Sequence, residues 1–412
     1  MKKVLMVAYH FPPLGGGGVF RTLKFAKYLP QFGFQPHILT VKNPMYTTKD
    51  PTLLKEIPPE TKVFRTFSFE HRVLKAPRLL NINLKWFYIP DVNVGWLPTA
   101  IHKGTKIIKK ENIDVIFATA PVWTSLLIGF ILKKKTKKPL VIDFRDPWTS
   151  SPFIRYPTKL HGKIERKMEE KILQYADHIT VAGSRIKSIL TKRHLHIRSK
   201  ITVITNGFDP DDFKNLKKQQ ANKFRITYTG SIYGLLTAKP FLLALKKLTK
   251  EKPNLRNKLE ALFVGNYGRE TPVLVKKLKL ENVVKLIAYT SHKKTIEYMV
   301  NSHILLLLIT VKGSLGKGIL TGKLFEYLAS RRPVLAIAPE NGAAAKIIKK
   351  LKAGKTVSPN NIELIKETIL KFYENWRQGK LNETTGDISQ YDRKFLTQQL
   401  VKILERVMRR QK

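Results

Sequence analysis

Short apolar runs alternate with amphipathic stretches along the whole chain. Runs of four to eight apolar residues between turn residues predict strands that are buried on both faces, and the stretches between them have the length and spacing of helices. The predicted strands of the first half are 2–8, 36–41, 113–119, 139–142, 177–184 and 201–204. Those of the second half are 224–229, 259–265, 284–288, 304–309, 334–337 and 356–357.

This alternation predicts an α/β fold with two doubly wound, Rossmann-like domains that face each other across a cleft. We expect an N-terminal domain over residues 1–205 and a C-terminal domain over residues 206–390. Residues 391–412 form an amphipathic pattern, which predicts a final helix that packs on the first domain. Residues 43–98 lack a regular pattern and are predicted to be irregular.

Composition narrows the class of protein. The 412 residues are 43% hydrophobic and 10% aromatic, which is typical of globular chains, and they include no cysteine. The missing cysteines exclude disulfides, thiolate zinc sites and a cysteine nucleophile. The longest apolar run, 126–132, is far shorter than the ~20 residues that span a bilayer, and the N-terminus has no cleavage signal. We expect a cytoplasmic protein that is soluble or peripheral on the inner face of the membrane.

The net charge of +46 favours polyanionic partners such as anionic lipids, nucleic acid or acidic glycans. The lysines are scattered evenly, so a Lys-rich composition of the source organism is the other explanation. Two segments are candidates for an anionic membrane surface. They are the aromatic and aliphatic stretch 79–90 and the lysine run 133–138.

A glycine loop follows the first predicted strand. Gly16 and Gly17 let the backbone approach a ligand closely, and Arg21 adds a cation for a phosphate or an acidic acceptor. The loop does not fit G-x-G-x-x-G, because Phe20 occupies the place of the third glycine, so a dinucleotide site is disfavoured.

Charged residues also follow the strand at 139–142. Asp143, Arg145 and Asp146 come at its carboxyl end, where parallel sheets bind ligands. Asp143 and Asp146 can orient an acceptor hydroxyl, or Asp143 can pair with Arg145. Asp209-Pro210-Asp211 has the spacing of a D-x-D metal motif, but turn and cap chemistry explains it better, and we predict no metal site.

The stretch with the most candidate site residues runs from 317 to 338, and Gly313, Gly316 and Gly318 predict a loop before its helix. A helix predicted to open at Gly322 places Leu324 toward the sheet and Lys323 and Glu326 together on the other side. The N-terminus of such a helix suits a phosphate, and a carboxylate one turn later can accept two ribose hydroxyls. The pattern indicates a nucleotide diphosphate pocket; the alternative is an ordinary crossover with a surface Lys–Glu pair.

Gly322-Lys323-Leu324-Phe325-Glu326-Tyr327-Leu328-Ala329 with Pro333-Val334-Leu335-Ala336 resembles the donor-binding segment of family 4-type glycosyltransferases of GT-B fold. The glycine loop, D-F-R-D-P-W, N-G-F-D and the strand end at Thr229-Gly230 resemble other segments of that family, in the same order. The resemblance implies a hexosyltransferase-type enzyme that moves a sugar from a nucleotide diphosphate sugar to an acceptor hydroxyl. It implies retention of configuration, no metal and no cofactor beyond the donor as co-substrate.

The resemblance also assigns roles. Lys239, Lys323 and the helix N-terminus at Leu324 would take the diphosphate, beside Gly230 and beside Ser231, which replaces the usual Arg. Glu326 would hold the ribose, whereas Gly318 stands where many members carry a sugar-binding Glu. In the first domain, Gly16 and Gly17 would close over the phosphates, and Arg145 and Asp146 would position the acceptor.

The expected acceptor is a saccharide or a lipid-linked saccharide in polysaccharide or glycolipid biosynthesis. Two alternatives stay open. The first is a nucleotide-sugar epimerase of the same fold. The second is a basic nucleic-acid- or polyanion-binding protein, which the charge supports but for which no recognition module is present.

Overall fold

The computed structural model describes residues 1–46, 48–70, 88–151, 154–216, 219, 221–311, 313–384 and 386–410. Contacts divide the chain into two compact units. The first unit is Met1–Asn206 with Arg393–Lys412, and the second unit is Gly207–Asp392. Stretch 79–90, a candidate membrane contact, falls mostly outside the described residues. No helix in the described ranges is long and apolar enough to cross a bilayer.

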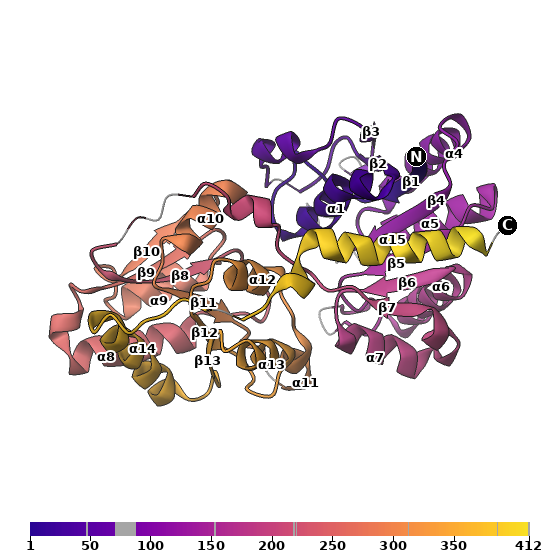
Figure 1. The fold of residues 1–412 in the computed structure, drawn as a ribbon. Coiled ribbons are helices and arrows are strands. Elements are labelled where there is room, and N and C mark those ends of the chain that lie inside the picture. The colour runs from indigo at the N-terminus through magenta and orange to yellow at the C-terminus, as the bar shows by residue number, and fades with distance from the viewer. Residues whose placement is uncertain are drawn as a thin grey trace. The chain divides into compact units, whose positions relative to one another are not determined.

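The first unit is built on a seven-stranded parallel sheet in the order β3-β2-β1-β4-β5-β6-β7 (Figure 1). All positions of β4 and β5 are buried, which explains why these strands are continuous apolar runs. The strands are β1 Lys2–Val7, β2 Phe34–Val41, β3 Lys62–Thr66, β4 Val115–Ala120, β5 Leu140–Phe144, β6 His178–Val181 and β7 Ile201–Val203.

The prediction that 43–98 is irregular was wrong for β3. This strand pairs with β2 from Lys62 to Thr66, and its first four positions are exposed or only half-buried. An edge strand of this kind carries charged and mixed residues in place of an apolar run, so its sequence gives little signal.

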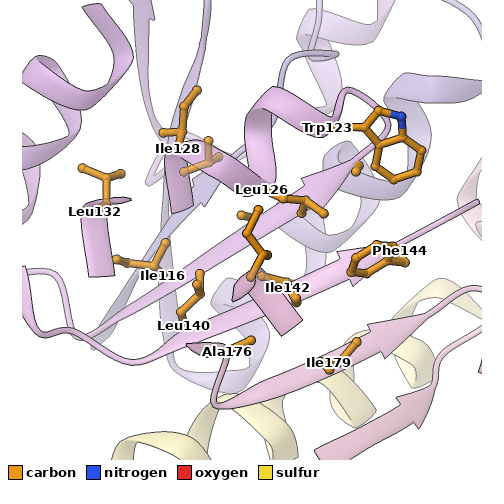
Figure 2. Packing of buried hydrophobic residues seen from close by; sticks show 14 of the residues in the cluster. Ile116, Trp123, Leu126, Ile128, Leu132, Leu140, Ile142, Phe144, Ala176 and Ile179 are labelled. Carbon is orange, nitrogen blue, oxygen red and sulfur yellow. The ribbon is translucent and has the colours of Figure 1, made fainter. Parts of the chain in front are cut away.

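Helices cover both faces of this sheet. On one face, α4 and α5 bury aliphatic side chains such as Leu126 and Leu132 against Ile116, Leu140 and Ile142 (Figure 2). On the other face, α1 and α15 share a core through residues such as Leu23 and Leu404. The C-terminal helix therefore packs on the first unit, as predicted. The helices of this unit are α1 Gly17–Tyr28, α4 Leu97–Lys110, α5 Trp123–Thr136, α6 Lys159–Tyr175, α7 Ser184–Arg193 and α15 Arg393–Arg409.

The second unit has a six-stranded parallel sheet in the order β10-β9-β8-β11-β12-β13. Its strands are β8 Phe224–Thr229, β9 Leu259–Val264, β10 Val284–Ile287, β11 Ile304–Leu308, β12 Val334–Ile337 and β13 Gly354–Val357. Its helices are α8 Lys239–Glu251, α9 Glu270–Lys277, α10 His292–Val300, α11 Gly313–Gly318, α12 Gly322–Ala329, α13 Ala343–Lys350 and α14 Ile362–Arg377. The glycine-rich segment before α12, expected as a loop, is the short helix α11.

In both sheets the strand order reverses once near the centre. The reversal lies between β1 and β4 in the first unit and between β8 and β11 in the second unit. Loops on either side of such a point leave in opposite directions, and ligands bind at the carboxyl ends of the strands there. The glycine loop after β1 and the segment from β11 to α12 therefore both start at these switch points.

Candidate functional site

Two glycine turns bring the ends of β8 and β9 together in the second unit. Gly230 has a φ of +103° and Gly265 a φ of +120°, values that favour glycine. A Cβ atom on Gly265 would lie 2.6 Å from the Gly230 carbonyl oxygen, so no side chain fits there. The Ile232 amide donates a hydrogen bond of 2.7 Å to the Asn266 carbonyl and joins the two loops. The carboxyl edge of this sheet therefore presents backbone and not side chains.

Lys323, in the first turn of α12, reaches this edge. Its Nζ donates a 2.7 Å hydrogen bond to the Tyr228 hydroxyl and lies 4.0 Å from the centroid of that ring. A Cβ atom on Gly230 would be 3.0 Å from the same Nζ, so the lysine lies directly beside the end of β8. Burial lowers the pKa of Lys323 to about 7, although the charge of Glu326 acts in the opposite direction. Gly230 and Lys323, two of the predicted site residues, are thus adjacent.

The orientation of α12 follows from its buried face. Leu324 and Leu328 are buried against the sheet, and the Tyr327 hydroxyl accepts a 2.9 Å hydrogen bond from the Thr229 amide. That hydroxyl also donates to the Leu306 carbonyl at 3.3 Å. The helix is therefore fixed to β8 and β11.

Lys323 and Glu326 are both half-buried and lie outside the buried face of α12. One oxygen of Glu326 lies 3.9 Å from Nε2 of His292, and the Glu326 side chain remains 19% exposed. An anion at the start of α12 would also meet the N–H groups of its first turn, which have no acceptor within the helix. Of these amides, that of Leu324 already donates to the Thr321 carbonyl at 3.3 Å.

The two remaining predicted donor residues are exposed. Lys239 is the first residue of α8, and its amide donates to the Thr237 hydroxyl at 3.1 Å. Its side chain has no partner among the residues that the structure describes. The Ser231 side chain is exposed, and its carbonyl accepts from the Tyr228 hydroxyl at 2.8 Å.

In the first unit, the glycine loop leads into α1. Gly16 is the N-cap with a φ of +82°, and a Cβ atom there would lie 2.6 Å from the Tyr46 hydroxyl. Gly17, the first residue of the helix, is exposed and has open space where its Cβ atom would be. The helix start is therefore exposed at Gly17, while the Val19 amide already donates to the Gly16 carbonyl at 3.1 Å.

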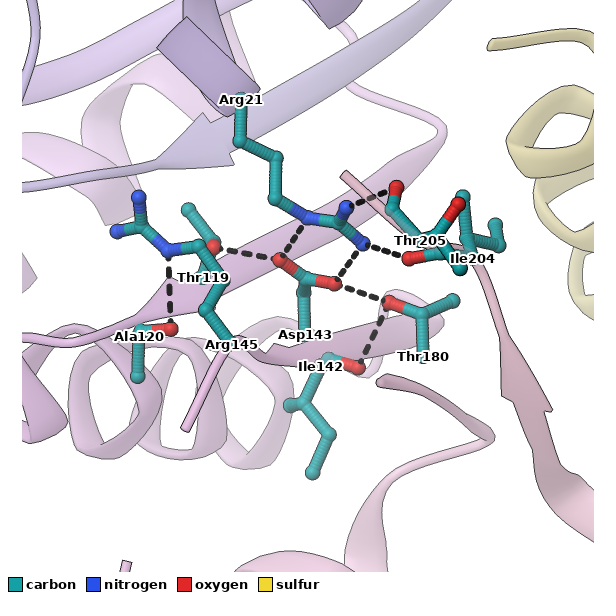
Figure 3. A network of polar contacts seen from close by, with 9 residues as sticks. All are labelled: Arg21, Thr119, Ala120, Ile142, Asp143, Arg145, Thr180, Ile204 and Thr205. Carbon is teal, nitrogen blue, oxygen red and sulfur yellow. Dashed lines mark hydrogen bonds and ion pairs between the residues drawn. The ribbon is translucent and has the colours of Figure 1, made fainter. Parts of the chain in front are cut away.

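Asp143 is completely buried and pairs with Arg21 (Figure 3). Arg21 donates to both carboxylate oxygens, from Nε at 2.9 Å and from a terminal nitrogen at 2.7 Å. The hydroxyls of Thr119 and Thr180 add one hydrogen bond each, both 2.7 Å long. Burial alone would raise the pKa of Asp143, but the charge of Arg21 and these hydrogen bonds outweigh it, and the pKa is lowered.

Arg21 completes its set of partners with the carbonyls of Ile204 and Thr205, both at 2.9 Å. Its guanidinium is therefore occupied by the protein, and the expectation that it meets a ligand phosphate does not fit this geometry. The alternative that Asp143 pairs with Arg145 is also wrong, because Asp143 pairs with Arg21.

Arg145 connects the glycine loop to the end of β4. Its guanidinium donates to the carbonyls of Gly18 at 2.5 Å, Ala120 at 3.1 Å and Pro121 at 2.7 Å. Burial lowers its pKa to about 10. Arg145 thus holds the backbone of the two predicted segments, and any effect on a ligand passes mainly through that backbone.

Asp146 differs from Asp143 in that it is exposed and has no hydrogen bond within the described part of the chain. The loop that carries Asp146 is held against α6. Trp148 donates to Glu165 at 3.0 Å, and the Thr149 amide donates to Glu169 at 3.3 Å. Asp146 is the member of the predicted triplet that can meet a ligand directly.

Sequence reasoning missed several partners of these residues. Thr119, Asp143 and Thr180 are in register across β4, β5 and β6, a relation visible only once the strands are aligned. His10 lies at the end of β1 beside Gly18, and burial and the charge of Arg145 lower its pKa to about 4. In the sequence, Tyr228 looks like any buried residue of a strand. Its role as a partner of Lys323 is visible only in the structure.

Two family models match the chain. The model described as "Glycosyltransferase Family 4" matches residues 15–212, and the model described as "Glycosyl transferases group 1" matches residues 210–395. Together they account for nearly the whole chain. No curated protein sequence gives a significant match.

Solved structures are similar over the full length. A glycosyltransferase from Rickettsia africae ESF-5 is 19% identical, with a TM-score of 0.66, and the match covers 99% of this chain and 98% of that one. WaaG, a glycosyltransferase involved in lipopolysaccharide biosynthesis, is 14% identical, with a TM-score of 0.60 and 98% of each chain covered. A structure described as a putative UDP-N-acetylglucosamine 2-epimerase from Listeria monocytogenes is 12% identical, with a TM-score of 0.59, covering 97% of this chain and 95% of that one. At these identities the likeness is one of fold, and it confirms the predicted GT-B architecture.

Asp143 and Asp146 should differ in how much they contribute to the stability of the fold. We expect Asp143→Asn to lower the free energy of unfolding by roughly 3–5 kcal/mol, because it leaves the buried Arg21 without a counter-charge. Asp146→Asn, the matched control at an exposed site, should change it by less than about 0.5 kcal/mol. Urea denaturation followed by circular dichroism measures both.

The same comparison has a defined pH dependence. The pKa of Asp143 is lowered from 3.8 in the folded state, so its contribution is complete above the unfolded value and is lost as the pH falls through the folded value. The difference between wild type and Asp143→Asn should therefore shrink below about pH 4. Equal stability of the two proteins at neutral pH would contradict the role assigned to the pair.

Proposed function

The chain belongs to the family 4 glycosyltransferases, and we propose that it transfers a sugar from a nucleoside diphosphate sugar to an acceptor hydroxyl. The observation that carries the donor site is the cluster of Gly230, Lys323 and Glu326 at the switch point of the second sheet. The family membership argues against an epimerase or a nucleic-acid-binding protein, the two alternatives that the sequence left open.

The donor diphosphate binds at the start of α12 in this proposal. Lys323 and the amides of the first helical turn lie where the backbone of Gly230 and Ser231 is open, and the exposed Lys239 supplies a second cation. Lys323 and the amides of α12 are held in place before the ligand arrives. They can therefore stabilise the negative charge that develops on the leaving diphosphate without reorganising.

Glu326 accepts hydrogen bonds from the ribose hydroxyls, one helical turn beyond the diphosphate. Lys323 and Glu326 are three residues apart outside the buried face of α12, so a single nucleotide can meet both side chains. The carboxylate adds selectivity because a buried acceptor without its hydroxyl partners is costly.

The first unit provides the acceptor side. Gly17 offers exposed backbone at the start of α1, next to the N-cap Gly16, and Asp146 is the exposed carboxylate that can orient the acceptor hydroxyl. Arg145 acts by holding the glycine loop. Asp143 acts indirectly, because it holds Arg21 and thereby the helix α1 that follows the loop. We further propose retention of configuration without a metal or cofactor, as is typical of this family.

For the acceptor we propose a saccharide or a lipid-linked saccharide of polysaccharide or glycolipid synthesis, reached by an enzyme that rests on the inner, cytoplasmic face of a membrane. The outer surface of α6 supports this location. Leu160 is 63% exposed and Ile164 38% exposed, and they are interleaved with the exposed Lys163, Lys167 and Lys171. Two contributions favour binding at a membrane surface: burial of apolar side chains at the edge of the acyl chains, and attraction of lysines to anionic headgroups.

The exposed charges of α6 differ from those of some other helices. The exposed charged residues of α6 are five cations and a single acid, Glu170. On α14, in the second unit, the exposed charged positions Glu367, Lys371, Glu374 and Arg377 are balanced. Because α4 and α13 also expose only cations, it is the exposed pair Leu160 and Ile164 beside the lysines that distinguishes α6.

A donor screen tests the function. We expect one of UDP, GDP and ADP, together with its sugar conjugates, to raise the melting temperature of the wild type, because ligands that bind the folded state stabilise it by mass action. Glu326→Ala should retain the wild-type melting temperature without ligand and lose most of the shift. If no nucleotide stabilises the wild type and polyanions do, the protein is a polyanion-binding member of the family and not a transferase.

The affinity for the nucleotide sugar should fall as the pH rises above 7. The pKa of Lys323 in the free protein is about 7, and a bound diphosphate raises it, so the binding form is populated below that pH. The dissociation constant should increase by up to about tenfold per pH unit between pH 7 and 9. Titration calorimetry checks this, and Lys323→Met, which removes the titrating group, should bind weakly with a flat profile over that range.

Flotation with liposomes tests the location. Wild type should float with vesicles that contain about 30% phosphatidylglycerol and stay behind with neutral vesicles, since each basic residue near such a surface adds about 1 kcal/mol. Lys163→Glu with Lys167→Glu on α6 should abolish flotation. Lys276→Glu with Lys277→Glu, which changes the net charge equally at exposed positions of α9, should not. Equal effects of the two pairs would indicate nonspecific charge attraction.

A further inference from the structure

A histidine lies between two carboxylates beside the proposed donor site, entirely within the second unit. His292 is the first residue of α10, whose N-cap Ser291 accepts from the Lys294 amide at 3.4 Å. Its Nε2 is 3.1 Å from an Asp212 oxygen and 3.9 Å from a Glu326 oxygen. The ring is 8% exposed, so few other positions are open to it.

These contacts set the direction of the hydrogen bond. A carboxylate accepts and does not donate, so Nε2 of His292 carries a hydrogen and donates it to Asp212. The same N–H dipole attracts the second carboxylate, that of Glu326. A glutamate side chain loses conformational freedom when it is held, and a partner that holds it beforehand removes that cost from ligand binding.

Asp212 is itself held in a short structured segment. It belongs to the 3-10 turn Pro210–Phe213, which Asp209 caps by accepting from the Asp211 amide at 3.0 Å. The side-chain contacts therefore run from this turn through α10 to α12. Each of the three groups comes from a different element, so the arrangement is not a by-product of one local motif.

We propose that His292 is a positioning residue for Glu326, and that Asp212, His292 and Glu326 together determine the preference of the site for ribose over 2-deoxyribose. The inference rests on the proposed function, because it assumes that Glu326 faces the nucleotide ribose. His292 touches neither the sugar nor the diphosphate in this scheme. It keeps the Glu326 carboxylate in the orientation that accepts the ribose hydroxyls.

A merely structural role for His292 would predict something different. Loss of an ion pair that only supports α10 weakens the fold and lowers the affinity for every nucleotide alike. A positioning role changes the ratio of affinities between a ribonucleotide and its 2′-deoxy counterpart, because only the former presents the 2′-hydroxyl to Glu326. The ratio is therefore the quantity to measure.

The experiment uses the full chain and the pairs UDP and dUDP, GDP and dGDP, and ADP and dADP, with dissociation constants from titration calorimetry. For the base that binds, wild type should favour the ribonucleotide by about tenfold or more, as expected for a lost hydrogen bond to a charged group. His292→Ala should reduce the preference to within about threefold while the affinity for the deoxynucleotide stays near wild type. His292→Gln, which keeps a donor on a side chain, should restore part of the preference.

Met299→Ala is the matched control. Met299 is buried in an apolar cluster on the same helix α10, so this variant should lower the melting temperature and leave the ratio unchanged. If His292→Ala lowers both affinities equally, or keeps the wild-type ratio, the inference is overturned while the donor site stands. If wild type binds no nucleotide, or binds one without a preference for ribose, the assignment of Glu326 in the proposed function fails first.

Discussion

The buried pair of Arg21 and Asp143 is the interaction on which the first unit depends. Two opposite charges without solvent are stabilising only when every hydrogen-bonding group around them is satisfied. Here Thr119 and Thr180 complete Asp143, and the carbonyls of Ile204 and Thr205 complete Arg21. The pair thereby connects α1 to strands β4, β5 and β6 and to the segment after β7. Because α1 is fixed in this way, the glycine loop that opens it is fixed too, and Arg145 can hold that loop from the other side.

The two units use their cations differently at equivalent places in the sheet. In the first unit the guanidinium groups at the switch point are saturated by a carboxylate or by carbonyls, so they shape the backbone. In the second unit Lys323 has an aromatic ring and a hydroxyl as partners, which leaves its charge largely uncompensated. A buried cation of this kind is unfavourable until an anion approaches. This contrast is consistent with the proposed roles, in which the first unit positions the acceptor and the second unit binds the diphosphate.

The repeated pattern of apolar runs was enough to predict the architecture, because strands buried on both faces leave a clear trace in the sequence. It failed at β3, an edge strand with mixed residues, and at α11, where three glycines suggested a loop. For the site, the spacing of Lys323 and Glu326 predicted that both lie outside the buried face of α12, and both are half-buried. The partners that fix them, Tyr228 and His292, come from β8 and α10. No local pattern links residues so far apart in the chain, and only the fold brings them together.

The saturation of the Arg21 network has a consequence for how this sequence can vary. Replacing Arg21, Asp143 or either threonine alone leaves a buried polar group without its partner. Replacing the pair and both threonines together by apolar residues of similar volume removes these polar side chains at once. Single substitutions in this network are therefore unfavourable, whereas simultaneous substitution of the whole network is tolerated. Related sequences should keep all four residues or replace all four together. These positions, although far apart in the chain, should therefore change together in evolution.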